Sequence, residues 1–327
     1  MRHWAMLACA WLGAGLGLAL AAQAQEEEST APAPAKVVVD IRSDRIVLLD
    51  IASVGKRLIA VGERGFTLVS DDAGTSWKGV QTPVTRTLTG IAFKDDKVGV
   101  AVGHGGAMIR TEDGGASWAQ VTLDEAGSDS LLGVTWLGGD HFAAYGAFGL
   151  YFDSQDAGRT WARVMVGADD FDRHISQVVA IGNGGPLLLV AESGTLARSD
   201  DGGATWTPLV SPYQGSYFGA IALPDGAALA FGMRGNIYRS ADQGTTWQKI
   251  ELGTTTSIMS GHVLADGRVL LVGNTGLLAL SGDGGQSFVL HSSGRGRGFA
   301  AFVEVDGRII LAGEGGITPL DPAWLGQ

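Results

Sequence analysis

Six aspartates recur at nearly constant spacing in this 327-residue chain, and they are the first residues that could carry acid–base chemistry. Each lies in an octet such as SDDAGTSW or SADQGTTW, where its carboxylate can accept hydrogen bonds from its own turn and the glycine can take a positive φ. The closing aromatic ring can pack against a strand. We therefore interpret both sets as structural and not catalytic: Asp72, Asp113, Asp156, Asp201, Asp242 and Asp283, which lie 41 to 45 residues apart, with Trp77, Trp118, Trp161, Trp206 and Trp247.

A second candidate group is the acidic stretch from Asp169 to His174, which holds three aspartates, an arginine and a histidine. A metal site would need ligands at suitable spacing from a second segment, and the chain contains neither H-x-H nor H-E-x-x-H. Its single cysteine, Cys9, excludes disulfides within the chain. We interpret the stretch as a solvated loop and expect no catalytic residue, no metal and no cofactor.

Arginines are the better candidates for recognition, because a guanidinium can bind a carboxylate with two parallel hydrogen bonds. Two of them alternate with glycines in the segment SGRGRG, for which a solvated turn is the alternative interpretation. Two others occupy matching positions in a repeated hairpin. The sequence predicts a partner-binding set on the loops: Arg64, Arg173, Tyr217, Arg234, Arg295 and Arg297.

The elements that must position these residues follow from a second repeat, the hairpin V-G-x-x-G and its variants. It precedes each octet and occurs once more near the end of the chain, closing at glycines 65, 106, 149, 194, 235, 276 and 316. Each unit of about 42 residues contains short apolar runs separated by glycine-rich turns, a pattern typical of strands. The repeats predict an all-β, seven-bladed propeller of four-stranded antiparallel blades.

Strand order predicts where the two turns lie. The octet joins the third strand of a blade to the fourth, and the hairpin joins the second to the third on the opposite face. The last unit supplies only three strands, so we expect the N-terminal run Lys36–Ile41 to complete the seventh blade and close the ring.

Composition narrows the partner class. The chain carries 23 basic and 34 acidic residues and a formal net charge of −11, so it has no electrostatic reason to bind nucleic acid. Its 51 glycines fit many tight turns, and 45% hydrophobic residues fit a substantial core. We expect a protein partner and a monomer.

The N-terminus predicts export. A basic start, an uncharged run from Trp4 to Ala22 and the sequence Ala22-Gln23-Ala24 indicate a signal peptide over residues 1–24, cleaved between Ala24 and Gln25. Residues 25–35 are acidic and then Ala/Pro-alternating, which predicts a flexible lead-in before a propeller over residues 36–327. The expected location is the periplasm, with no membrane span in the mature chain. A retained membrane anchor is the alternative.

The octets resemble the Asp-boxes of BNR-repeat proteins, among them sialidases and photosystem II assembly factors. The pairing of hairpin and octet, as in VGERGFTLVSDDAGTSW, is most similar to the photosystem II assembly and stability factors. That resemblance implies a non-catalytic scaffold that binds a membrane or envelope complex. Two alternatives stay open: an accessory subunit of an RND-type exporter and a sialidase-like glycosidase. Against the latter, the chain lacks an R-I-P segment and has seven units, whereas sialidases usually have six blades.

Overall fold

The computed structural model describes residues 38–39, 41–167, 171–182, 185–292 and 296–325. The predicted signal peptide and lead-in fall on residues 1–35, outside this description. In the described part of the chain, no helix has the length and apolar character needed to cross a membrane.

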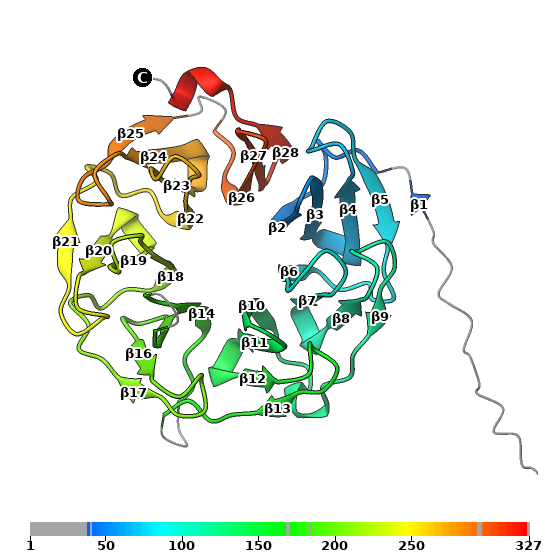
Figure 1. The fold of residues 1–327 in the computed structure, drawn as a ribbon, viewed down its shortest axis with the longest axis horizontal. Helices are drawn as coiled ribbons and strands as arrows, with labels where there is room; N and C mark the ends of the chain where they lie inside the picture. The colour runs from blue at the N-terminus through cyan, green and yellow to red at the C-terminus, as the bar shows by residue number, and fades with distance from the viewer. Residues whose placement is uncertain (1–37, 40, 168–170, 183–184, 293–295, 326–327) are drawn as a thin grey trace, which may run out of the picture. The chain divides into compact units, whose positions relative to one another are not determined.

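Seven antiparallel sheets stand around a ring, and the strands nearest its centre are β2, β6, β10, β14, β18, β22 and β26 (Figure 1). We number these sheets blades 1 to 7 in chain order. This arrangement confirms the predicted seven-bladed, all-β propeller. The first four blades are β2 (Leu48–Val54), β3 (Arg57–Gly62), β4 (Phe66–Ser70) and β5 (Lys78–Gln81); β6 (Leu88–Phe93), β7 (Gly99–Gly103), β8 (Met108–Thr111) and β9 (Ala119–Gln120); β10 (Leu131–Gly138), β11 (His141–Gly146), β12 (Tyr151–Ser154) and β13 (Ala162–Arg163); and β14 (Ile175–Ala180), β15 (Leu187–Ala191), β16 (Leu196–Ser199) and β17 (Thr207–Pro208).

The remaining blades follow the same order from the centre outwards, and 3₁₀ turns occupy most of the hairpins. Blades 5 to 7 are β18 (Tyr217–Ala222), β19 (Ala228–Gly232), β20 (Ile237–Ser240) and β21 (Gln248–Ile250); β22 (Ile258–Val263), β23 (Val269–Gly273), β24 (Leu277–Ser281) and β25 (Val289–Ser292); and β26 (Phe299–Val305), β27 (Arg308–Gly313) and β28 (Gly316–Pro319). The 3₁₀ turns are η1 (Glu63–Gly65), η2 (His104–Gly106), η3 (Asp124–Ala126), η4 (Ala147–Gly149), η5 (Met233–Gly235), η6 (Asn274–Gly276) and η7 (Pro322–Leu325).

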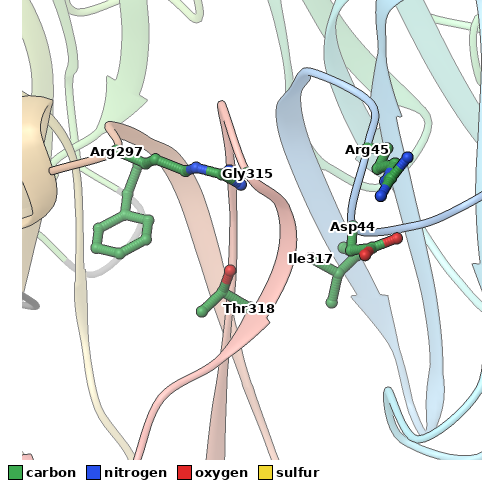
Figure 2. Close-up of a pocket in the computed structure, with 7 residues that line it drawn as sticks. Asp44, Arg45, Arg297, Gly315, Ile317 and Thr318 are labelled. Carbon is green, nitrogen blue, oxygen red and sulfur yellow. The ribbon is translucent and has the colours of Figure 1, made fainter. Parts of the chain in front are cut away.

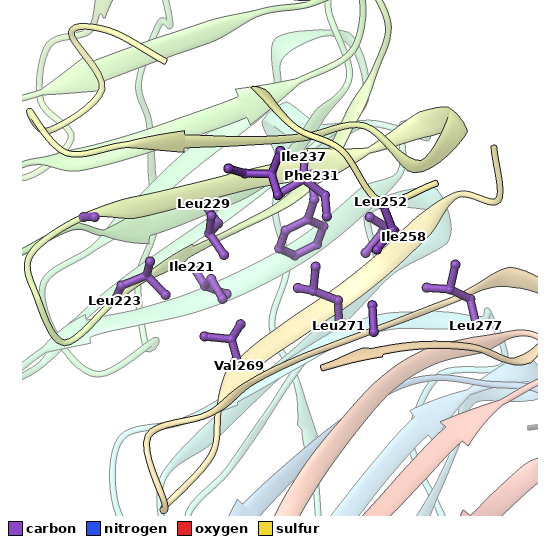
Figure 3. Close-up of a cluster of buried hydrophobic side chains, with 13 residues drawn as sticks. Ile221, Leu223, Leu229, Phe231, Ile237, Leu252, Ile258, Val269, Leu271 and Leu277 are labelled. Carbon is purple, nitrogen blue, oxygen red and sulfur yellow. The ribbon is translucent and has the colours of Figure 1, made fainter. Parts of the chain in front are cut away.

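The hydrophobic core lies between the blades. The second strands, such as β19 and β23, are buried along their whole length because a neighbouring blade covers each of their faces. Figure 3 shows one interface, in which Leu229 and Phe231 of blade 5 pack against Val269 and Leu271 of blade 6. Each joint in the ring therefore removes apolar surface from water, at roughly 25 cal/mol per Å².

The expected closure by the N-terminal strand is wrong. In the structure β1 (Val38–Val39) pairs antiparallel with β5, with Val38 opposite Val80, so it lies on the outer edge of blade 1. Blade 7 has three strands among the described residues.

The edge of β28 gives a physical reason for this difference. The N–H of Ile317 donates to the carbonyl of Ser43 at 2.8 Å, while that of Leu320 faces the other way, to Ile309. Because alternate residues of a strand face opposite edges, Pro319 lies on the same edge as Ile317 and offers no N–H to another strand. The ring closes instead through apolar packing of Leu48 and Leu58 against Ile310 and Ala312.

Arginines add a polar connection at several joints, because each reaches a main-chain carbonyl in the octet turn of the next blade. Arg57 reaches Gly114, and Arg110 reaches Ala157, with N···O distances of 3.0 and 2.7 Å. Arg239 and Arg308 reach Gly284 and Ala73 in the same way, at 3.1 and 2.5 Å. The last of these contacts joins blade 7 to blade 1, so the closing joint has the same arginine contact as these other joints.

Candidate partner-binding face

The two ends of the propeller carry different loops. The octet turns and the turns between first and second strands lie on one face, which we call the octet face. The V-G-x-x-G hairpins and the linkers between blades lie on the other, which we call the hairpin face. This division follows from the antiparallel strand order and agrees with the prediction.

The octet aspartates hold their own turns together. In blade 4 the hydroxyl of Ser199 donates to Asp201 Oδ1 at 2.8 Å, and Thr205 donates its N–H to Oδ1 and its hydroxyl to Oδ2, at 2.9 and 2.6 Å. The first residue of each other octet makes the same bond to its aspartate, at 2.7 to 2.9 Å. These carboxylates are committed to structure, so the geometry supports their interpretation as turn residues.

The octet tryptophans divide into two groups. Trp77, Trp161 and Trp247 donate the indole N–H to the octet glycine carbonyl at 3.0 to 3.2 Å. Trp118 and Trp206 are more deeply buried and have no acceptor for this group in the described structure. Phe93 and Tyr151 contact them edge-to-face, with ring centroids 6.2 and 5.5 Å apart. These two tryptophans thus pack against an aromatic ring and do not bond to the octet glycine.

Asp50, which the sequence analysis did not single out, lies on β2 in the wall of the central channel. Its Oδ1 accepts the N–H of Ile51 at 2.8 Å, and its Oδ2 accepts that of Ile91 in blade 2 at 2.9 Å. Burial raises the pKa of this carboxyl to about 6, because the loss of water outweighs the two hydrogen bonds to the charged form.

The shifted carboxyl pKa values give two contributions to stability that change with pH in opposite directions. The pKa of Asp50 is raised in the fold, so stability should increase as the pH falls through about 6. The pKa of Asp72 and Asp201 is about 2, because Ser76 and Thr205 hydrogen-bond their charged forms, so the stability they contribute is lost as the pH falls from about 4 to 2.

Urea unfolding at a series of pH values from about 2.5 to 8 measures how the free energy of unfolding depends on pH. Asp50→Asn should abolish the increase between pH 7 and 5 and keep the loss below pH 4. An unchanged increase in that variant would show that another group causes it. The other titratable side chains among the described residues of the channel wall are His104, Tyr145 and His262. Burial lowers the pKa of His262, so its contribution to stability decreases as the pH falls, and the contribution of Asp50 is therefore the difference between the profiles of the original chain and Asp50→Asn.

Three of the predicted arginines lie exposed on the hairpin face. Arg64 and Arg234 occupy the third position of their hairpins with φ of 66° and 58°, in the left-handed region, so their side chains project from the turn. Arg297 lies beside Gly315 in a cavity of about 560 Å³, which Arg45 and Thr318 also line (Figure 2). The guanidinium groups of Arg45, Arg64, Arg234 and Arg297 form no hydrogen bond or ion pair within the described part of the chain.

On the octet face, by contrast, arginines form ion pairs. There Arg57 pairs with Asp71 at 2.7 Å, Arg198 with Asp200 at 2.6 Å and Arg159 with Glu112 at 3.2 Å. On that face arginines stabilise turns and joints, whereas several on the hairpin face are available for an external anion. The three predicted arginines are spread over an arc from blade 5 to blade 1 and do not share one blade.

The other predicted arginines have different outcomes. Arg173 lies exposed in the linker between blades 3 and 4 and faces Asp172 at 3.6 Å, so it is on the predicted face but is partly neutralised. Arg295 falls outside the described residues.

Tyr217 is a wrong prediction as an exposed contact residue. It begins β18 and is fully buried, with its hydroxyl 3.0 Å from Ser211 Oγ. Its ring packs against Tyr213 and Tyr238, with centroids 5.7 and 6.1 Å away. Burial raises the pKa of this phenol to about 12, so it also stays protonated at neutral pH.

An exposed aromatic residue on the hairpin face was not among the predicted site residues. Phe148 is 55% exposed at the third position of its hairpin, with φ of 52°. The ring of His174 meets it edge-to-face at 4.8 Å. The repeat could have indicated this residue, because Phe148 occupies the hairpin position at which blades 1 and 5 carry Arg64 and Arg234.

Comparison with known proteins identifies the family of the chain. The sequence model described as photosynthesis system II assembly factor YCF48 matches residues 70–293. The chain belongs to the YCF48 family. Among proteins with curated functions, none matches the sequence.

Solved YCF48 structures share the fold. YCF48 bound to a D1 peptide is 19% identical, with a TM-score of 0.69, over 86% of this chain and 93% of that one. YCF48 from Cyanidioschyzon merolae is 18% identical, with a TM-score of 0.68, over 88% and 99% of the two chains. An ancestral GH74 enzyme reaches a TM-score of 0.70 at 15% identity, over 85% of this chain and 45% of its own. At these identities each likeness shows the fold alone.

Proposed function

We propose that this YCF48-family chain is a non-catalytic scaffold that binds a partner protein through its hairpin face. In this proposal it is exported to the periplasm and assists the assembly or function of a membrane or envelope complex. The observation that carries the proposal is the set of exposed arginines on that face without an acceptor in the described structure. The YCF48 that was solved with a D1 peptide supports it, because a propeller of the same family binds a protein segment.

The arginines indicate the chemistry of the partner. Arg64, Arg234 and Arg297 can each present a planar pair of donors to a carboxylate, which favours an acidic segment. Arginine is enriched among the residues that dominate binding energy at protein interfaces. The chain itself is acidic, so these side chains are a local exception to its net charge of −11 and would orient a partner towards this face.

The non-catalytic part of the proposal rests on what the candidate acids and phenols do. The octet aspartates are saturated by their own turns, and Tyr217 is buried against Ser211. A sialidase-like mechanism needs an accessible tyrosine nucleophile with a carboxylate partner. Turnover of a fluorogenic sialoside by the purified chain would contradict this part.

The test is capture of the partner from solubilised host membranes by the tagged full chain, followed by mass spectrometry. Replacing Arg64, Arg234 and Arg297 together by alanine should reduce the captured partner at least about tenfold, since all three are exposed and none supports the core. The ring should keep its thermal stability.

A matched control replaces Lys56, Lys78 and Lys97, three exposed lysines at or beside the octet face, with alanine. It changes the net charge by the same amount and should leave capture intact. Equal losses in the two triple variants would place the interaction elsewhere. Recovery of an exporter subunit would select the transporter-accessory alternative within the same binding role.

A further inference from the structure

The central channel is a cavity of about 540 Å³, enclosed by the innermost strands of all seven blades, which surround the centre in Figure 1. Its wall is mostly apolar or neutral, with side chains such as Leu132, Phe218, Met259 and Thr89. Among the described residues that line it, Asp50 supplies the one carboxylate, and there is no lysine or arginine. The channel therefore places a single carboxylate in a wall that offers it no lysine or arginine as a partner.

The repeat shows that this charge is particular to blade 1. Each innermost strand has a register shift between its first and third residues, which aligns the seven strands and makes Asp50 the third residue of β2. The same position in blades 2 to 7 carries a neutral residue: Gly90, Gly133, Gln177, Gly219, Ser260 and Ala301.

The fold does not need a charge at this position. Asp50 accepts the N–H of Ile91 in the next blade, and Gln177 makes the equivalent bond to Ala220, with a shorter distance of 2.7 Å against 2.9 Å. A neutral amide oxygen therefore makes the inter-blade connection as well as a carboxylate does. Burial of the charge is unfavourable by itself, as the raised pKa of Asp50 shows.

We propose that the central channel binds a primary ammonium group on an apolar stem, with Asp50 as its counter-ion. A carboxylate offers roughly four acceptor positions, and the structure uses one on each oxygen of Asp50. Asp50 has no cationic partner among the described residues. The apolar and aromatic wall, including Phe218 and Trp136, suits the stem and can contact the ammonium group through a ring face.

This chemistry favours an ammonium group over a divalent metal ion. Calcium takes six to eight oxygen ligands and magnesium six, and the described residues contain no group of three or more acidic, histidine or cysteine side chains placed to hold a metal. The ammonium group can come from a small free amine or from a lysine side chain of a partner. The proposal is independent of the hairpin face, so its failure leaves the proposed partner binding untouched.

Titration calorimetry at pH 7.5 with n-hexylamine tests it, with n-hexanol as the neutral probe of the same stem. Hexylamine should bind the full chain and hexanol at least about tenfold more weakly. Asp50→Asn should weaken hexylamine binding at least about tenfold, because it removes a charged acceptor. Asp96→Asn, an exposed acid outside the channel, is the matched control and should change nothing.

A second variant keeps the test decisive if Asp50→Asn folds poorly. Gln177→Glu places a carboxylate at the equivalent position of blade 4 and should strengthen hexylamine binding. Competition by Nα-acetyl-lysine methylamide would support a lysine side chain as the source of the ammonium group, and hexylamine binding without it would support a free amine. Equal binding of hexylamine by the original chain and Asp50→Asn, equal binding of hexanol, or no measurable hexylamine binding would overturn the proposal.

Discussion

Replacing Gly194 with alanine is expected to lower the free energy of unfolding by about 3 to 5 kcal/mol. Gly194 closes the hairpin of blade 4 with φ of 73°, where an L side chain is strained. An added Cβ would lie 2.0 Å from the carbonyl oxygen of Tyr213, in the linker to blade 5. Since that neighbour is backbone, the hairpin and the linker must separate, which also breaks the bond from Gly194 N–H to Gly215 at 2.8 Å.

Gly226→Ala is the matched control for this substitution. Gly226 also has a positive φ, of 83°, but nothing lies within 4 Å of an added Cβ. The control should cost about 1 kcal/mol, from the backbone conformation alone. Urea unfolding of both variants measures the difference, which isolates the close contact between hairpin and linker. Equal losses would mean that the hairpin relaxes freely and that this contact does not limit the joint.

Tyr217→Ala is expected to be similarly severe, at about 3 to 5 kcal/mol, because it removes a fully buried aromatic ring. The ring lies in the cluster between blades 4 and 5, beside Val190, Ala230 and Tyr238. The resulting cavity would weaken the packing of two blades at once. The free energy of unfolding is again the measurement.

Tyr217→Phe separates packing from recognition. It keeps the ring and removes the hydroxyl that meets Ser211, so it should cost about 1 kcal/mol and leave partner capture unchanged. If Tyr217→Phe were stable but lost its partner, Tyr217 would act as a contact residue despite its burial, and the correction made above would fail.

The parts of this molecule that could be predicted from sequence are those determined within a few residues. The groups that donate hydrogen bonds to an octet aspartate lie between two residues before it and four residues after it, so its role is local. The division into two faces follows from antiparallel strand order. The hairpin-face positions of Arg64 and Arg234 were therefore predictable from the repeat.

The errors lie where distant segments compete or cover one another. The strand β1 could pair with the outer edge of blade 1 or with that of blade 7. Pro319 and the Ser43–Ile317 bond make the edge of blade 7 the less suitable one. Tyr217 was misplaced although its position carried a signal. In the other blades the first residue of the innermost strand is apolar and buried: Leu48, Leu88, Leu131, Ile175, Ile258 and Phe299.

The closing joint has a mechanical consequence. At each of the other joints the polypeptide runs directly from one blade into the next. In the described structure, blades 7 and 1 meet without such a linker and without a shared strand. This joint is therefore held by non-covalent contacts alone: the Arg308 hydrogen bond, the Ser43–Ile317 hydrogen bond and the apolar contacts of Leu58. A force that pulls the two ends of the chain apart should break these contacts before it unfolds any blade, and the ring should open between blades 7 and 1 with its blades intact.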